Sequence, residues 1–145
     1  MKLLSIRAPW WWWILHGGKD IENRDWKSPP KYRGTLAIQA SATWIQREVE
    51  DDDISARIMA MDAACATDPP MSPPMNLAEF RHLGGHIVGR CDLVDVVTDS
   101  ESPWFTGRYG LVLANPVPLK NPIPFKAMLG LMNVPPEIAE KVAAS

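Results

Sequence analysis

A chain of 145 residues fits one domain with a hydrophobic core of its own, and its formal net charge of -2 excludes a global positive field that would hold a polyanion. Two cysteines far apart in the chain, without a CxxC pair or a histidine at zinc-ligand spacing, indicate neither a disulfide framework nor a metal site. No apolar run reaches the about 20 residues that a membrane helix needs, and the N-terminus lacks a signal-peptide pattern, so we expect one cytoplasmic domain over residues 1–145 without metal, cofactor or membrane segment.

The N-terminal part of the chain predicts a strand, a short helix and a charged second strand. Residues 3–8 are apolar-rich, which favours a strand, and the proline that opens the segment 9–16 suits the first turn of a helix. Two glycines then end this helix. Because side chains alternate between the two faces of a strand, Glu22 and Arg24 should share one face of the segment 21–26.

Four consecutive tryptophans lie in the predicted first helix. They cannot share one helical face, because each residue turns the side chain by about 100°. We expect Trp10 and Trp13 to pack in the core, and Trp11 or Trp12 to reach solvent or the candidate site.

The rest of the chain predicts a small sheet with helices of unequal length. Further strands are expected at residues 34–41, 86–98 and 109–114, and further helices at 42–66, 77–83 and 135–144. Four prolines make the segment at about 67–75 a surface loop, and the prolines of 115–126 confine that segment to a sheet edge or an irregular ribbon. Residues 102–108 have turn chemistry with exposed aromatic side chains. The pattern predicts an α+β domain in which a small, curved sheet of five or six strands closes on itself.

The densest group of charges follows the first helix. Cations outnumber carboxylates between residues 19 and 33: Lys19, Arg24, Lys27, Lys31 and Arg33 against Asp20, Glu22 and Asp25. Two interpretations stay open. The charges form either a solvated polar edge, in which Lys19 and Glu22 pair and fix the turn, or a ligand site beside the apolar helix.

Five blocks of the sequence, in this order, resemble the ASCH domain: residues 4–10, 18–24, 32–38, 85–89 and 104–110. Within the second block, Lys19, Glu22 and Arg24 match the family signature G-x-K-x-x-E-x-R. The resemblance implies a PUA-like small β-barrel of mostly antiparallel strands flanked by helices. It also implies a cleft for RNA or a modified nucleoside.

The same resemblance implies the residues of the site. Lys19, Glu22 and Arg24 would lie in the cleft, with Ser5 and Arg7 beside them on the first strand. Trp26 and Trp104, both next to turns, are candidates for stacking a base, an interaction worth roughly 1–3 kcal/mol, and their alternative role is to cap the barrel mouth.

An enzyme is the main alternative to a binding domain. Some small ASCH proteins are similar to amidohydrolases that deacylate N4-acetylcytidine with a lysine, a threonine three residues later and a distant glutamate. Lys19 matches the lysine, but Glu22 occupies the position of the threonine, and its charge should raise the pKa of Lys19, the wrong direction for a base. A hydrolase of acylated cytidine or of RNA would use Lys19 and Glu22 as acid and base, with a hydroxyl from Ser5 or Thr106. A protein-interaction adaptor that presents tryptophans is the third alternative.

Overall fold

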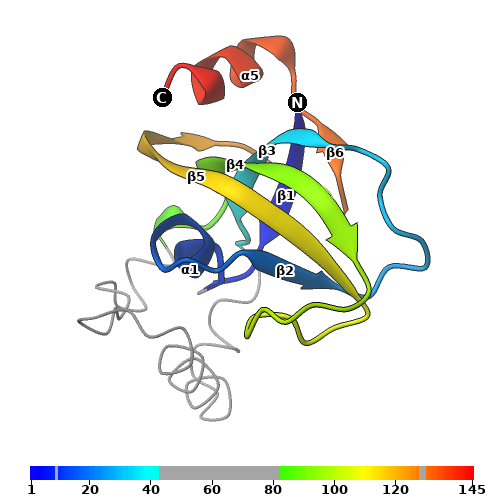
Figure 1. The fold of residues 1–145 in the computed structure, drawn as a ribbon. Helices are drawn as coiled ribbons and strands as arrows, with labels where there is room; N and C mark the ends of the chain where they lie inside the picture. Colours follow the sequence, from blue (N-terminus) through cyan, green and yellow to red (C-terminus); the bar gives the residue numbers. More distant parts are fainter. Residues whose placement is uncertain (9, 43–81, 128–129) are drawn as a thin grey trace.

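The fold is built on a mixed sheet that curls into a half-barrel (Figure 1). The structure is a computed structural model and describes residues 1–8, 10–42, 82–127 and 130–145. Its elements, in chain order, are β1 (Lys2–Ile6), α1 (Trp10–His16), β2 (Ile21–Arg24), β3 (Gly34–Ala40), β4 (His86–Val97), β5 (Tyr109–Pro124), β6 (Met132–Asn133) and α5 (Pro136–Ala143). Apart from residues 42, 82 and 83, the predicted helices at 42–66 and 77–83 and the predicted loop at 67–75 lie outside the described residues.

The described strands form one sheet of six in the order β2-β5-β4-β3-β1-β6. β1 pairs with β3 in parallel, and the other four pairings are antiparallel. The α+β class and the mostly antiparallel, curled sheet are therefore confirmed. Because β2 and β1 stand four places apart in the sheet, contacts between them cross the interior of the curl rather than follow the ladder of backbone hydrogen bonds.

Helix α1 ends at a pair of glycines that fit two different requirements. Gly18 adopts φ 75°, a left-handed conformation that glycine enters at little cost. A Cβ atom at Gly17 would lie 2.1 Å from Cε3 of Trp13, so only glycine fits beneath that indole. The backbone N–H of Lys19 donates to the carbonyl of Trp13 at 3.0 Å, which fixes where the chain leaves the helix. This turn keeps the backbone of Lys19 next to the last turn of α1.

Strand β5 is longer than predicted. We expected a strand at 109–114 followed by an edge or an irregular ribbon, and the structure shows one strand that continues to Pro124. Its first part, residues 109–112, also pairs with β2, and among the described strands the remainder pairs with β4 alone, as an edge. Proline is tolerated on such an edge, because its missing N–H faces away from the sheet. Local shifts of register against β4 accommodate the change of direction.

Two groups of buried apolar residues hold the fold together. The larger one fills the half-barrel and includes the tryptophans of α1, with the rings of Trp13 and Trp104 5.7 Å apart. Trp11 and Trp12 are only 1% and 4% exposed, so of the two places predicted for one of them, solvent or the candidate site, solvent is wrong. Trp10, at the start of the helix, is the partly exposed member. The smaller group packs α5 against the sheet far from α1, as Figure 1 shows.

Candidate functional site

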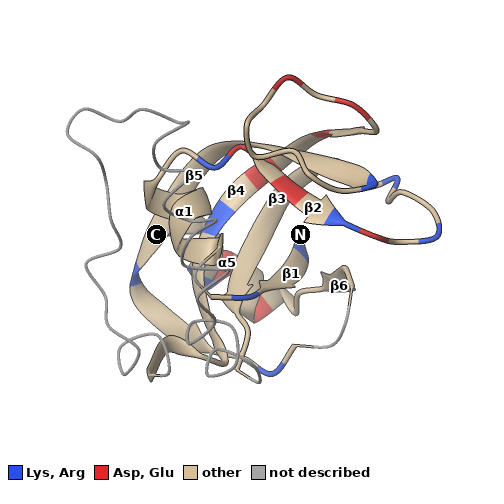
Figure 2. Cartoon of the chain, turned by 90° about the horizontal axis from the view of Figure 1, so that it is seen from below, with Lys and Arg blue, Asp and Glu red and all other residues tan. Residues whose placement is uncertain are grey.

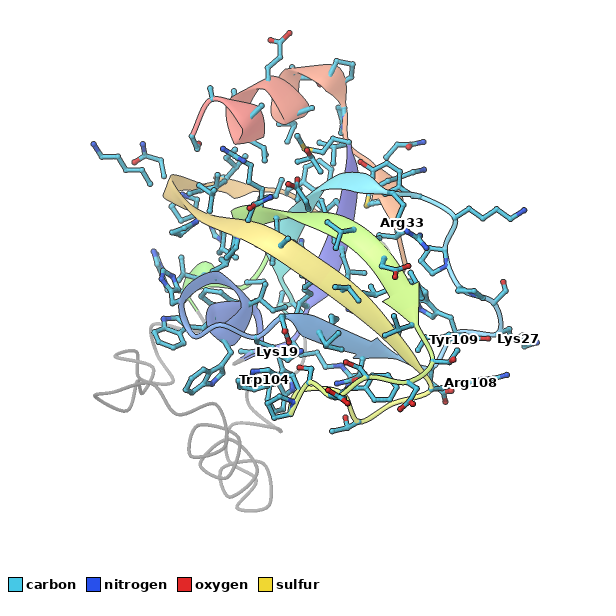
Figure 3. All side chains as sticks on the ribbon, viewed as in Figure 1. Lys19, Lys27, Arg33, Trp104, Arg108 and Tyr109 are labelled. Atoms are coloured by element: carbon cyan, nitrogen blue, oxygen red, sulfur yellow. The ribbon has the colours of Figure 1, made fainter. Side chains whose placement is uncertain are left out.

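Lys19 is a buried lysine at the end of α1, with 4% of its surface exposed. Its Nζ donates to the carbonyl oxygen of Ile21 and lies 3.8 Å from Oε2 of Glu22. The same atom lies 5.8 Å and 5.9 Å from the ring centroids of Trp10 and Trp104. Figure 3 shows Lys19 and Trp104 close to each other on the side of β2 that faces α1. An ammonium group is thus held between one carboxylate and two indole faces.

Burial has the largest effect on the pKa of Lys19. Loss of water lowers the pKa of the Lys19 ammonium, and this effect exceeds the opposing influence of Glu22, which raises it. The charge of Arg24 lowers the pKa further, and Asp20 raises it. The prediction of a raised pKa is therefore wrong. The sequence shows the neighbouring carboxylate, but it does not show how completely the Lys19 side chain is removed from water.

Arg24 connects β2 to β1, two strands that are not neighbours in the sheet. Its Nη2 donates to the carbonyl oxygen of Ser5 in β1 at 2.9 Å, and its guanidinium carbon lies 5.7 Å from the ring centroid of Trp26. Burial lowers the pKa of Arg24, Glu22 raises it and Arg7 lowers it. Ser5 therefore lies in β1 next to Arg24, as expected, whereas Arg7 follows the end of β1 at Ile6 and acts on Arg24 through its charge.

Two buried polar atoms of this group have no hydrogen-bond partner among the described residues. They are Oε2 of Glu22, an acceptor, and Nε of Arg24, a donor. Glu22 is 8% exposed, and its carboxylate interacts electrostatically with both Lys19 and Arg24. Leaving a polar atom buried and unpaired costs roughly 1–3 kcal/mol. The strand therefore carries one acceptor and one donor without a hydrogen bond among the described residues, and the ion pair with Lys19 compensates part of this cost for the acceptor.

Asn23, on the opposite face of β2, holds the loop that carries Trp104. Its Nδ2 donates to the carbonyl of Trp104 at 2.8 Å, and its Oδ1 accepts from the backbone N–H groups of residues 106 and 107 at 2.9 and 3.1 Å. Next to it, the hydroxyl of Ser102 donates to Oδ1 of Asp20 at 2.6 Å. The sequence does not predict these hydrogen bonds of Asn23 and Ser102, because their partners are about 80 positions apart and no local pattern links them.

Comparison with known proteins decides the family. The model of the ASCH domain family matches residues 4–107, which is more than half of the chain. The chain belongs to the ASCH domain family. The ASCH protein of Zymomonas mobilis has a similar solved structure, with a TM-score of 0.53 and 13% identity over 99% of this chain and 93% of that one. A point mutant of the same protein gives a TM-score of 0.56 and 14% identity over 99% and 96%. Comparison with curated proteins found no match.

These similarities concern the fold, since both solved structures share less than 25% of their residues with this chain. ASCH domains have a PUA-like fold, and the family is generally associated with RNA binding. Among the described residues, no three His, Cys, Asp or Glu side chains gather as metal ligands. The described helices include none long and apolar enough to cross a membrane.

In this ASCH domain the residues predicted for the site come together unequally. Lys19 and Glu22 are in contact, and Arg24 follows them on the same strand. Trp26 is partly buried with Arg24 over its ring. Trp104 is only 1% exposed, so the prediction of an exposed aromatic residue there is wrong. Its ring forms part of the wall around Lys19 because Asn23 holds its loop inward.

Proposed function

We propose that this ASCH domain binds a nucleobase or a short RNA at the group formed by Lys19, Glu22 and Arg24, called here the Lys19–Arg24 site. The observation that carries the proposal is that Oε2 of Glu22 and Nε of Arg24, on the same strand, are buried without a hydrogen-bond partner among the described residues, although Oε2 keeps its ion pair with Lys19. A base edge presents hydrogen-bond donors and acceptors side by side and would pair both atoms. Ser5 and Arg7 adjoin this site, and Trp26 offers an aromatic face for stacking. We also propose that the chain functions as one domain.

Glu22→Gln is the sharpest test, because glutamine preserves the volume and one acceptor but removes the charge between the two cations. We expect this variant to weaken binding of a labelled single-stranded RNA about tenfold, the effect of losing one hydrogen bond to a charged group. Fluorescence anisotropy measures the affinity, and circular dichroism verifies that the variant is folded. Lys120→Ala, an exposed change on the edge part of β5, is the control. Equal affinities of Glu22→Gln and the wild-type protein would contradict the proposal.

A hydrolase remains the second candidate, because the buried state of Lys19 favours it. Burial lowers the pKa of the Lys19 ammonium, which is the direction that a general base requires. Incubation with N4-acetylcytidine, followed by chromatography of released cytidine, tests this function. We expect turnover that is lost in Lys19→Met if the lysine acts as a base. Absence of turnover in the wild-type protein would leave binding as the function.

The described part of the chain does not present the feature that an adaptor requires. Such a protein would present a contiguous apolar patch. Among the described residues, Val94 is the large hydrophobic residue that is exposed, at 49%, and the described tryptophans are buried or partly buried.

A further inference from the structure

We propose that the loop between β2 and β3, residues 25–33, binds the phosphates of single-stranded RNA next to the Lys19–Arg24 site, through Lys27 and Lys31. This inference rests on the proposed function and makes it more specific. It assigns a polynucleotide rather than a free nucleoside as the ligand, because a nucleoside has no phosphate for these two lysines.

The loop has an excess of positive charge on a chain that is negative overall. From residue 24 to residue 33 the sequence has four cations and one carboxylate, whereas the whole chain carries -2. Figure 2 shows lysine and arginine on the loop that leaves the end of β2. Arg33 lies 3.7 Å from Asp95 and is thereby partly neutralised. Lys27 and Lys31 are exposed, and neither has a carboxylate within ion-pair distance among the described residues.

Internal hydrogen bonds hold the loop in shape. Arg33 donates through Nη1 to the carbonyl oxygens of Pro30 and Tyr32, at 3.0 and 2.9 Å. The hydroxyl of Tyr32 donates to the carbonyl of Thr35 at 2.6 Å, and consecutive prolines at 29 and 30 fix their own φ angles. A loop that is already ordered loses little conformational entropy when it binds. Lys31 therefore lies in a preorganised segment that Arg33 helps to hold, and Lys27 lies two residues before the prolines that begin this segment.

Aromatic rings at the same end of the sheet match the bases of an unpaired strand. Arg24 in β2 is paired in register with Tyr109 in β5. The guanidinium carbon of Arg108 lies 5.5 Å from the ring centroid of Tyr109. The guanidinium carbon of Arg24 lies 5.7 Å from the ring centroid of Trp26 in the same way. Figure 3 shows Lys27, Arg33, Arg108 and Tyr109 on one side of the molecule. Phosphate-binding lysines beside aromatic rings are the combination that single-stranded nucleic acids require.

The dependence of affinity on salt tests this assignment. The probe is a fluorescein-labelled single-stranded RNA of mixed sequence, about eight nucleotides long, titrated between about 50 and 200 mM KCl. Each phosphate contact with a single strand contributes roughly 0.7 to the slope of log K against log salt, so Lys27→Ala/Lys31→Ala should reduce the slope by roughly 1.4. The matched control is Lys120→Ala/Lys141→Ala, which removes the same charge from β5 and α5, away from the loop (Figure 1). It should leave the slope unchanged.

The outcomes separate this inference from the function on which it rests. If the wild-type protein does not bind the RNA, the proposed function is wrong and this inference fails with it. If Glu22→Gln weakens binding but Lys27→Ala/Lys31→Ala keeps the wild-type salt slope, RNA binding at the Lys19–Arg24 site is supported and phosphate binding by the loop is wrong. Equal reductions of the salt slope in the loop variant and in the control variant would also overturn phosphate binding by the loop, because they would reflect net charge alone.

Discussion

Replacement of Asn23 by alanine should destabilise the fold, although the side chain is polar and only partly buried. Its amide forms three hydrogen bonds with the backbone of residues 104–107. At a net contribution of about 0.5–1.5 kcal/mol each, the three bonds give a range of roughly 1.5–4.5 kcal/mol. Residues 106 and 107 are exposed, so water can replace two of the bonds in the variant. We therefore expect a loss of about 2 kcal/mol, in the lower part of this range.

Urea denaturation followed by circular dichroism measures this loss. The midpoint should fall while the dependence on urea stays the same, because the surface exposed on unfolding hardly changes. In thermal unfolding, the same loss should lower the Tm by roughly 4–8 °C for a chain of this size. Asn23→Asp should be intermediate, because it preserves the acceptor for two N–H groups and places a carboxylate against the carbonyl of Trp104.

Asn121→Ala is the matched control, an exposed asparagine on the edge part of β5, and it should change stability by less than about 0.5 kcal/mol. An Asn23→Ala variant as stable as this control would refute the reasoning, since the loop would then hold its position without the amide.

Three further predictions concern buried groups. Gly17→Ala should cost about 3 kcal/mol because its Cβ would meet the buried indole of Trp13, whereas Gly18→Ala has space and should cost about 1 kcal/mol for its left-handed backbone; equal urea midpoints would contradict this difference. Burial, with Asp92 and Glu22, raises the pKa of the Cys91 thiol to about 12, so in a Cys65→Ser variant the native protein should not react with a maleimide near pH 8 until it unfolds. Because burial lowers the pKa of Lys19, the unfolded chain binds more protons than the folded one between this lowered pKa and the ordinary lysine pKa of 10.5. The free energy of unfolding of the wild type minus that of Lys19→Met should therefore rise with pH in this window. A flat difference from about pH 8 to 10 in urea titrations would argue against the shift.

Local patterns predicted the elements around the site because the signals are short in range. Two glycines after the tryptophans mark the end of α1, and the alternation of residues 21–26 puts Glu22 and Arg24 on one face of β2. The prolines after residue 115 correctly indicated a sheet edge, but they do not prevent a regular strand there. Proline removes a donor on one side of a strand only, so an edge accepts it without becoming irregular.

Long-range contacts explain what the sequence could not predict. The bond from Arg24 to Ser5 depends on how far the sheet curls, and the hold of Asn23 on Trp104 depends on a loop 81 positions away. The depth of burial of Lys19 decides its pKa, and that depth depends on packing from α1 and the loop around Trp104. A sequence pattern shows which groups are charged, but not how much water each of them retains.

The bridge between Arg24 and the Ser5 carbonyl has a consequence for how the domain would respond to its ligand. It is a single side-chain bond at a place where β2 and β1 have no ladder between them. A ligand that takes Nη2 as well as Nε of this guanidinium competes with Ser5, so ligand binding and separation of β1 from β2 become thermodynamically linked. Tight binding at Arg24 would then be accompanied by faster hydrogen exchange at the ends of β1 and β2, because the bound ligand would separate the two strands.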